Sequence, residues 1–129
     1  MTVNGEAASV EVDGDGYCVI ERVWNKDRVV VKFTAPVKMS VINGKIAFTK
    51  GPIALARDRR LDNIEAPVAI RAKNGKTVRA KAVRNTTFDC NIAYEIKTED
   101  GNIILCDYAQ AGKNYDDENT GITVWQMKK

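Results

Sequence analysis

The residues of this 129-residue sequence that could do chemistry are carboxylates and thiols, because it has no histidine and only two serines, Ser9 and Ser40. Without imidazole, neither a Ser-His-Asp triad, nor a Cys-His pair, nor a histidine-ligated metal centre can form. Seventeen Asp and Glu side chains leave paired-carboxylate glycoside hydrolysis formally open, but no spacing singles out a pair at the required separation. We therefore predict a chain with no catalytic residues, no metal site and no cofactor.

The three cysteines, Cys18, Cys90 and Cys106, are too few and too scattered for a disulfide framework. Each lies in an apolar stretch, which predicts buried free thiols. Unpaired thiols and the polar residues that follow Met1, in place of a secretory leader, favour a cytoplasmic location.

Two acidic runs could gather oxygen ligands for a hard cation. Residues 11–16 place acids at the first, third and fifth positions of a calcium-like loop, but its twelfth position is Arg22 instead of a bidentate glutamate. We predict an Asp/Gly hairpin turn there. The second run, residues 115–119, is interpreted as a solvated loop before the last strand.

A basic segment contains six cationic residues and no acid: Arg71, Lys73, Lys76, Arg79, Lys81 and Arg84. Such a segment could meet phosphates, but no aromatic residue lies between Phe48 and Phe88 to stack on a base. Basic residues on an exposed edge strand also discourage aggregation, which is the interpretation we favour. With a net charge of only +3 and no apolar run of bilayer length, we expect neither a nucleic-acid nor a membrane partner.

Four aromatic residues could stack on a sugar ring: Trp24, Tyr108, Tyr115 and Trp125. For Trp24 and Trp125 a core position is the favoured interpretation. If the chain contacts carbohydrate, the residues expected to do so are Tyr115 and Trp125, with Asp116 beside them.

The elements that must position these residues are strands, because the dominant sequence period is two. Val37, Met39 and Val41 alternate with polar residues, so one face of that segment is apolar and the other is wet. The same alternation recurs in three further sets of side chains: Val29, Val31 and Phe33; Val78, Ala80 and Ala82; and Ile92, Tyr94 and Ile96. No segment has a sustained helical period.

Turn signals separate these segments at short intervals. Asn43-Gly44, Asn74-Gly75 and Asp100-Gly101 are dipeptides that readily adopt the positive φ angles of tight hairpins. The strands that they predict span residues 37–42, 45–49, 68–71, 78–84, 92–97 and 103–107, with a closing strand at 122–125. This spacing predicts an all-β fold, an antiparallel two-sheet β-sandwich of the jelly-roll kind with roughly ten short strands. Residues 1–129 are interpreted as a single domain.

Four stretches of the sequence, taken in order, resemble a known family. They are residues 3–6, 16–24, 44–58 and 105–113, the last two including Gly51-Pro52 and Asp107-Tyr108-Ala109. Together they look like the β-sandwich that follows the barrel in bacterial proteins of the β-L-arabinofuranosidase family of glycoside hydrolases, formerly a domain of unknown function. The likeness spans most of the chain and is thinnest between Arg59 and Asp89.

The resemblance implies a non-catalytic accessory domain of a carbohydrate-metabolising protein. In the family, an (α/α) barrel carries a zinc bound by cysteines and a glutamate, together with a cysteine nucleophile, and no residue here matches those motifs. The implied partner is that catalytic barrel, against which this domain would pack. The departures are Asn25-Lys26-Asp27, where the family has a Gly-Asp turn, and Met1, where a preceding strand normally leads in.

Two further partners follow as alternatives to the barrel, a carbohydrate and a second copy of the chain. The domain could be a carbohydrate-binding module that uses its exposed aromatic residues. Without its barrel it should expose an apolar face and self-associate as a homo-oligomer.

Overall fold

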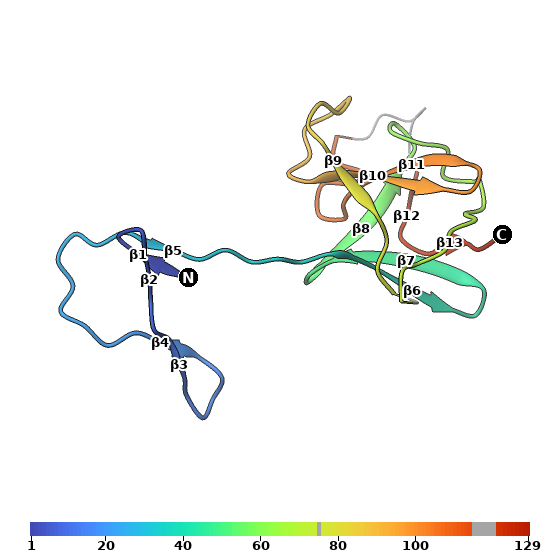
Figure 1. Ribbon diagram of the computed structural model, residues 1–129. Coiled ribbons are helices and arrows are strands. Elements are labelled where there is room, and N and C mark those ends of the chain that lie inside the picture. The colour runs from blue at the N-terminus through green and yellow to red at the C-terminus, as the bar shows by residue number, and fades with distance from the viewer. Residues whose placement is uncertain (75, 115–120) are drawn as a thin grey trace. The chain divides into compact units, whose positions relative to one another are not determined.

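The computed structural model describes residues 1–74, 76–114 and 121–129, which form thirteen β-strands and no helix (Figure 1). All strand pairings within the named sheets are antiparallel among these residues. The all-β, sandwich-like fold class expected from the sequence is confirmed. No described segment forms a helix long and apolar enough to cross a bilayer. The chain divides into two compact units, Met1–Thr34 and Ala35–Lys129. That residues 1–129 act as one domain stays a prediction.

Unit 1, residues Met1–Thr34, contains two small sheets. Its strands are β1 (Thr2–Val3), β2 (Glu6–Ala7), β3 (Glu11–Val12), β4 (Cys18–Val19) and β5 (Val29–Val30). One sheet has the order β2-β1-β5, and the other is the hairpin β3-β4. Asn4 and Gly5, with φ angles of 54° and 88°, make the tight turn between β1 and β2. The Asn4 side chain also accepts a hydrogen bond from the Arg28 amide at 2.9 Å, which ties the first turn to the start of β5.

Unit 2, residues Ala35–Lys129, is built around one eight-stranded sheet. Its strands are β6 (Val37–Ile42), β7 (Lys45–Lys50), β8 (Ile53–Asp58), β9 (Ala80–Val83), β10 (Ala93–Thr98), β11 (Gly101–Asp107), β12 (Ile122–Thr123) and β13 (Gln126–Met127). The sheet runs β13-β7-β8-β11-β10-β9, while β6 also pairs with β7 and β12 with β8. Because β7 and β8 each have three strand partners, the sheet branches and curls.

The hairpin β6–β7 shows how sequence fixes register in this unit. Asn43 and Gly44 have φ angles of 49° and 72°, the two positive values that a two-residue turn of the I′ kind requires. Ile42 then pairs with Lys45, and the ladder continues to Val37 opposite Lys50. The predicted strands at 37–42 and 45–49 are therefore confirmed.

The core of unit 2 lies inside the curled sheet. Its buried cluster comprises Val37, Met39, Ile46, Phe48, Leu55, Val68, Val78, Ile96, Ile103 and Leu105. Burying one such side chain stabilises the fold by about 1.5–3 kcal/mol. These residues come from strands far apart in the sequence, so the core holds the whole unit together.

Several sequence predictions for unit 2 are wrong in detail, among them the single closing strand at 122–125, which is divided into β12 and β13. Residues 68–71 form no strand, because Val68 makes only a single bridge to Lys128. Val41 continues the apolar alternation of β6, but it is exposed because the core ends before it. Ala93 falls on the polar face of the alternation that contains Ile92, Tyr94 and Ile96, but it is buried.

The core face predicted in unit 1 is also wrong. Val29, Val31 and Phe33 were expected to face a core, but all three are exposed, Phe33 to 88%. They still share one face and line one groove, so the alternation is right. Unit 1 has no second layer of its own to cover that face. Val3 is the one buried apolar residue of unit 1.

Candidate functional site

Of the three residues predicted to contact carbohydrate, the structure describes Trp125, whereas Tyr115 and Asp116 lie outside the described residues. Trp125 follows β12 and is 43% exposed, so its predicted core position is wrong. Together with Ile42, Asn43 and Lys45 it lines a hollow of about 260 Å³. A half-exposed indole beside a carboxamide can stack on a sugar ring and bind its hydroxyls.

Trp24 in unit 1 is likewise exposed, at 50%, and contradicts the prediction of a core position. The Arg22 guanidinium lies over its ring at 5.4 Å from the ring centroid. Trp24 lines a groove of about 770 Å³ whose walls are almost wholly apolar. The residues that line this unit 1 groove are Met1, Val10, Val12, Cys18, Ile20, Trp24, Val29, Val31 and Phe33.

The groove also changes the interpretation of the cysteines. Cys18 is exposed in the groove wall, so the prediction of a buried thiol is wrong for it. Cys106 on β11 is buried as predicted, and Cys90 is intermediate. Burial, with Cys90 and the carboxylates of Asp58 and Asp107 nearby, raises the pKa of Cys106 to about 12. Cys106 is therefore a neutral packing residue and a poor nucleophile.

A densely bonded polar pair, Asp58 and Arg60, lies at the end of β8. The Arg60 guanidinium donates from Nε to Asp58 Oδ1 at 2.9 Å and from Nη2 to Oδ2 at 2.6 Å. The amides of Arg60 and Gly112 donate to the same carboxylate at 3.0 and 2.9 Å. Asp58 is fully buried. Its two oxygens therefore join the end of β8 to the loop that follows β11.

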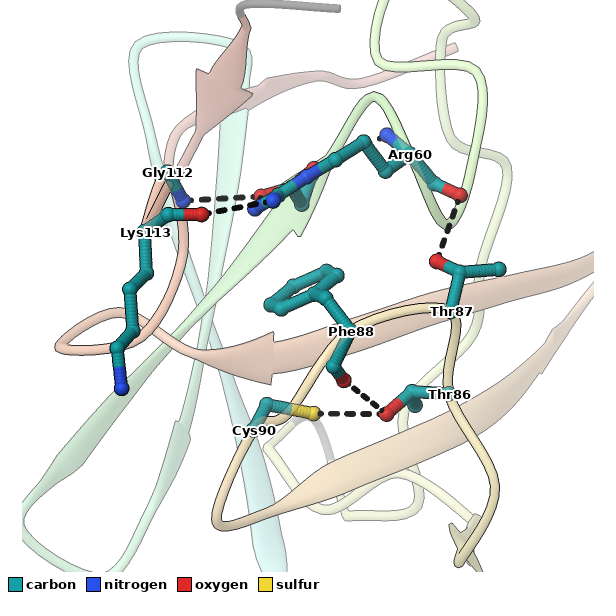
Figure 2. Close-up of polar contacts among 8 residues, drawn as sticks. Arg60, Thr86, Thr87, Phe88, Cys90, Gly112 and Lys113 are labelled. Carbon is teal, nitrogen blue, oxygen red and sulfur yellow. Dashed lines mark hydrogen bonds and ion pairs between the residues drawn. The ribbon is translucent and has the colours of Figure 1, made fainter. Parts of the chain in front are cut away.

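Figure 2 shows how Arg60 also reaches a third segment of the chain. Its guanidinium lies over the Phe88 ring, with Cζ 3.8 Å from the ring centroid, and Nη1 donates to the carbonyl of Lys113 at 2.7 Å. The Thr87 hydroxyl donates to the Arg60 carbonyl at 3.3 Å. We name Asp58, Arg60, Phe88 and Gly112 the polar cluster, since they hold three loops at one end of the sheet.

The electrostatics of the polar cluster argue against acid-base chemistry. Burial alone would raise the pKa of Asp58, but the Arg60 side chain, the Gly112 and Arg60 amides and the Arg60 charge together lower it below the ordinary value. At neutral pH Asp58 is thus an ionised carboxylate whose oxygens are occupied by donors of the same unit. A general acid needs the opposite, a raised pKa and an accessible proton.

A buried arginine, Arg57, adjoins Asp58 in β8 and is paired in the same way. Arg57 is 1% exposed and donates to Asp62 at 3.0 Å, to the carbonyl of Ala66 at 2.7 Å and to that of Asn63. A guanidinium can be buried at modest cost only when its donors are satisfied in this way. The loop after β8 is therefore folded around Arg57.

The acidic run of residues 11–16 is the predicted hairpin turn. The Asp13 carboxylate accepts hydrogen bonds from the amides of Asp15 at 3.0 Å and Tyr17 at 2.8 Å, and β3 pairs with β4 on either side. Within the described ranges, no group of three Cys, Asp or Glu side chains could hold a metal ion. The run at 115–119 falls on residues 115–120, which are not described, and its interpretation stays a prediction.

Sequence reasoning missed both the unit 1 groove and the polar cluster. The signal for the cluster was present, because Arg57, Asp58 and Arg60 follow directly on the apolar residues of β8. Charged residues that continue a buried strand are expected to be paired. Nothing local indicated that Gly112 or Phe88 would be their partners.

No family model, no curated protein and no solved structure matches this chain in the three comparisons that were made.

Proposed function

We propose that this chain is a non-catalytic accessory module of a β-L-arabinofuranosidase-like glycoside hydrolase. In this proposal unit 2 is a self-sufficient sandwich-like body, and unit 1 packs against the catalytic (α/α) barrel of the parent protein. The unit 1 groove is the observation that carries the proposal.

The first support is the size of unit 1. A folded body of 34 residues buries too little surface to be stable alone, and such units usually need disulfides, metals or a partner. Its single thiol, Cys18, has no disulfide partner. Contact with a further folded surface is the remaining way to stabilise it.

The second support is the chemistry of the groove. Its lining is aliphatic and aromatic, and it has the volume of a site for large side chains. Strand β5 has a hydrogen-bonding partner, β1, on one edge only among the described strands. A docking domain could therefore cover the groove and also pair with the free edge of β5.

The decisive experiment is to read the coding sequence upstream of Met1 and to produce any encoded domain together with this chain. We expect an (α/α) barrel that co-purifies with the chain, and loss of co-purification in the double variant Val31→Asp/Phe33→Asp. The matched control is Val41→Asp/Ile42→Asp, two exposed apolar residues of unit 2. An upstream sequence without a helical barrel, or equal loss in both variants, would contradict the proposal.

A second candidate function is a carbohydrate-binding module, favoured by the half-exposed Trp125 beside Asn43. Isothermal titration calorimetry with arabinose-containing oligosaccharides tests it. Binding heat that disappears in Trp125→Ala and persists in Tyr108→Ala, an exposed aromatic outside that hollow, would support the module. Absence of heat with the unmodified chain would argue against it.

A further inference from the structure

A small hollow on unit 2 is lined by cationic side chains and by no acidic one. Arg71, Lys73, Arg79 and Lys97 line it, and its volume is about 210 Å³. The other lining residues are Ile70, Thr77 and Val78. We name this feature the cationic hollow.

The backbone around the cationic hollow is fixed by hydrogen bonds. The Lys73 amide donates to the Thr77 carbonyl at 2.6 Å, and the Thr77 amide donates back at 3.0 Å. The Val78 amide donates to the carbonyl of Val37 in β6 at 3.0 Å. Lys97 belongs to β10, which lies between β11 and the edge strand β9, and it pairs with Asn102 of β11. The cations therefore project from anchored positions, which lowers the entropy cost of gathering them around a ligand.

The charge of the hollow is not balanced by the protein. Arg71 Nε lies 3.0 Å from Glu99 Oε1, but both side chains are exposed, and such pairs contribute little. Lys73, Arg79 and Lys97 have no carboxylate partner among the described residues. Like charges gathered at one site repel each other, and an anion in the hollow would relieve that repulsion.

We propose that the cationic hollow binds one oxyanion group, a carboxylate or a sulfate, of an acidic saccharide. Arg79 offers a planar fork of donors that matches such a group, and Lys73 and Lys97 supply further positive charge. The Thr77 hydroxyl can bond to a ring hydroxyl. Ile70 and the buried Val78 provide an apolar floor for the face of the sugar ring.

The lining favours a saccharide over a nucleic acid. No aromatic side chain lines the hollow, so a base would have nothing to stack on. The volume is below that of common ligand pockets and suits a single charged group with part of one ring. The choice of a saccharide as the carrier of the oxyanion rests on the proposed function, whereas the recognition of the oxyanion rests on the hollow alone.

Calorimetry on the full chain at low salt tests the proposal, with trigalacturonate as the acidic probe and maltotriose as its neutral counterpart. We expect trigalacturonate to bind and maltotriose not to bind. Removing two charge-assisted hydrogen bonds in Arg79→Gln/Lys97→Gln should weaken binding by at least about tenfold. The matched control, Lys32→Gln/Lys113→Gln, removes the same charge outside the hollow and should change affinity less than about twofold.

Three outcomes would overturn the proposal. They are no binding of trigalacturonate, equal weakening in both double variants, and binding of inorganic sulfate or single-stranded DNA as tight as that of trigalacturonate. The Arg79→Gln/Lys97→Gln variant leaves every residue of the unit 1 groove unchanged, so its co-purification with the barrel reports on the proposed function separately. Failure of one proposal can therefore be distinguished from failure of the other.

Discussion

Units 1 and 2 both contain strands in which apolar residues alternate with polar ones, but only unit 2 covers the apolar face with further strands. In unit 2 the alternating apolar residues of β6 and β7, such as Met39 and Phe48, face a core that other strands close. In unit 1 the equally regular Val29, Val31 and Phe33 line an open groove. Alternation thus predicts which side chains share a face, while burial of that face depends on a second layer.

The two units are accordingly held together by different interactions. Unit 2 combines its apolar cluster with fully bonded buried charges such as Asp58. Unit 1 depends on exposed polar contacts, among them the hydrogen bond that the Asn4 side chain donates to Asp27 at 2.6 Å. Exposed polar contacts contribute little free energy, so unit 1 should open more easily than unit 2.

The largest expected difference concerns the thiols. Cys18 is exposed in unit 1, whereas the pKa of Cys106 in unit 2 is raised from its ordinary value of 9.0 to about 12. That rise alone lowers the thiolate fraction at neutral pH by roughly a thousandfold relative to an ordinary thiol, and burial slows access further. Mass spectrometry during iodoacetamide labelling of the native chain should show Cys18 modified first and Cys106 last. Comparable labelling rates for the two would mean that Cys106 is accessible to the reagent in the native chain, contrary to its burial in unit 2.

Truncation of one phenylalanine in each unit tests the same contrast in stability. Phe48→Ala removes a side chain with no exposed surface and should lower the free energy of unfolding by about 3–5 kcal/mol. Phe33→Ala removes an exposed side chain and should change it by less than about 0.5 kcal/mol. Urea unfolding followed by circular dichroism measures both. A large loss in Phe33→Ala would show that the groove is already covered in solution, for example by a second copy of the chain.

The sequence predicts well what is local in this fold. The β6–β7 hairpin follows from Asn43-Gly44 and the flanking alternation, because the turn type sets the register of both strands. The Asp13 turn follows from the same local chemistry. The segment after Pro67 forms no strand because pairing is a tertiary property: Val68 makes one isolated bridge to Lys128, and the Ala69 carbonyl accepts one hydrogen bond from the Glu99 amide, without a continuous ladder.

The candidate site could be predicted less completely, because its contacts are long-range. Asp58 bonds to Gly112, which is 54 residues away, and Arg60 reaches Lys113 at a similar separation. No spacing rule connects such positions before the sheet topology is known. The exposure of Trp24 and Trp125 likewise depends on a covering layer, which the sequence around them does not specify.

The smallest effect expected is a pH dependence carried by one carboxylate in each unit. Hydrogen bonds from the Asn25 amide and the Asn4 side chain, with the Arg22 charge, hold the pKa of Asp27 in unit 1 below its ordinary value of 3.8. The pKa of Asp58 in unit 2 is also lowered. A depressed folded-state pKa gives stability that is present above the unfolded value and lost as pH falls through the folded value. Both carboxylates therefore stabilise the chain at neutral pH, and the chain loses that stabilisation in acid.

Substituting these two carboxylates should lower the free energy of unfolding by different amounts. At neutral pH, Asp58→Asn replaces the buried partner of Arg60 and should lower the free energy of unfolding by about 2–3 kcal/mol, the range for hydrogen bonds to charged groups. Asp27→Asn should lower the free energy of unfolding by a smaller amount, because the hydrogen bonds of Asp27 lie at the surface of a unit without a closed core. The surface control is Glu65→Gln, which breaks the exposed ion pair with Arg59. It should change the free energy of unfolding little. Urea unfolding at neutral pH and near pH 3 should show the difference between Asp58→Asn and the unmodified chain shrinking in acid. Below the ordinary pKa of 3.8, Asp58 takes up a proton more readily in the unfolded chain than in the folded chain, where its pKa is lowered, so part of the carboxylate's contribution to stability is lost. An undiminished difference would mean that Asp58 stabilises unit 2 by shape and hydrogen bonding alone, and that its charge has no part in holding the three loops.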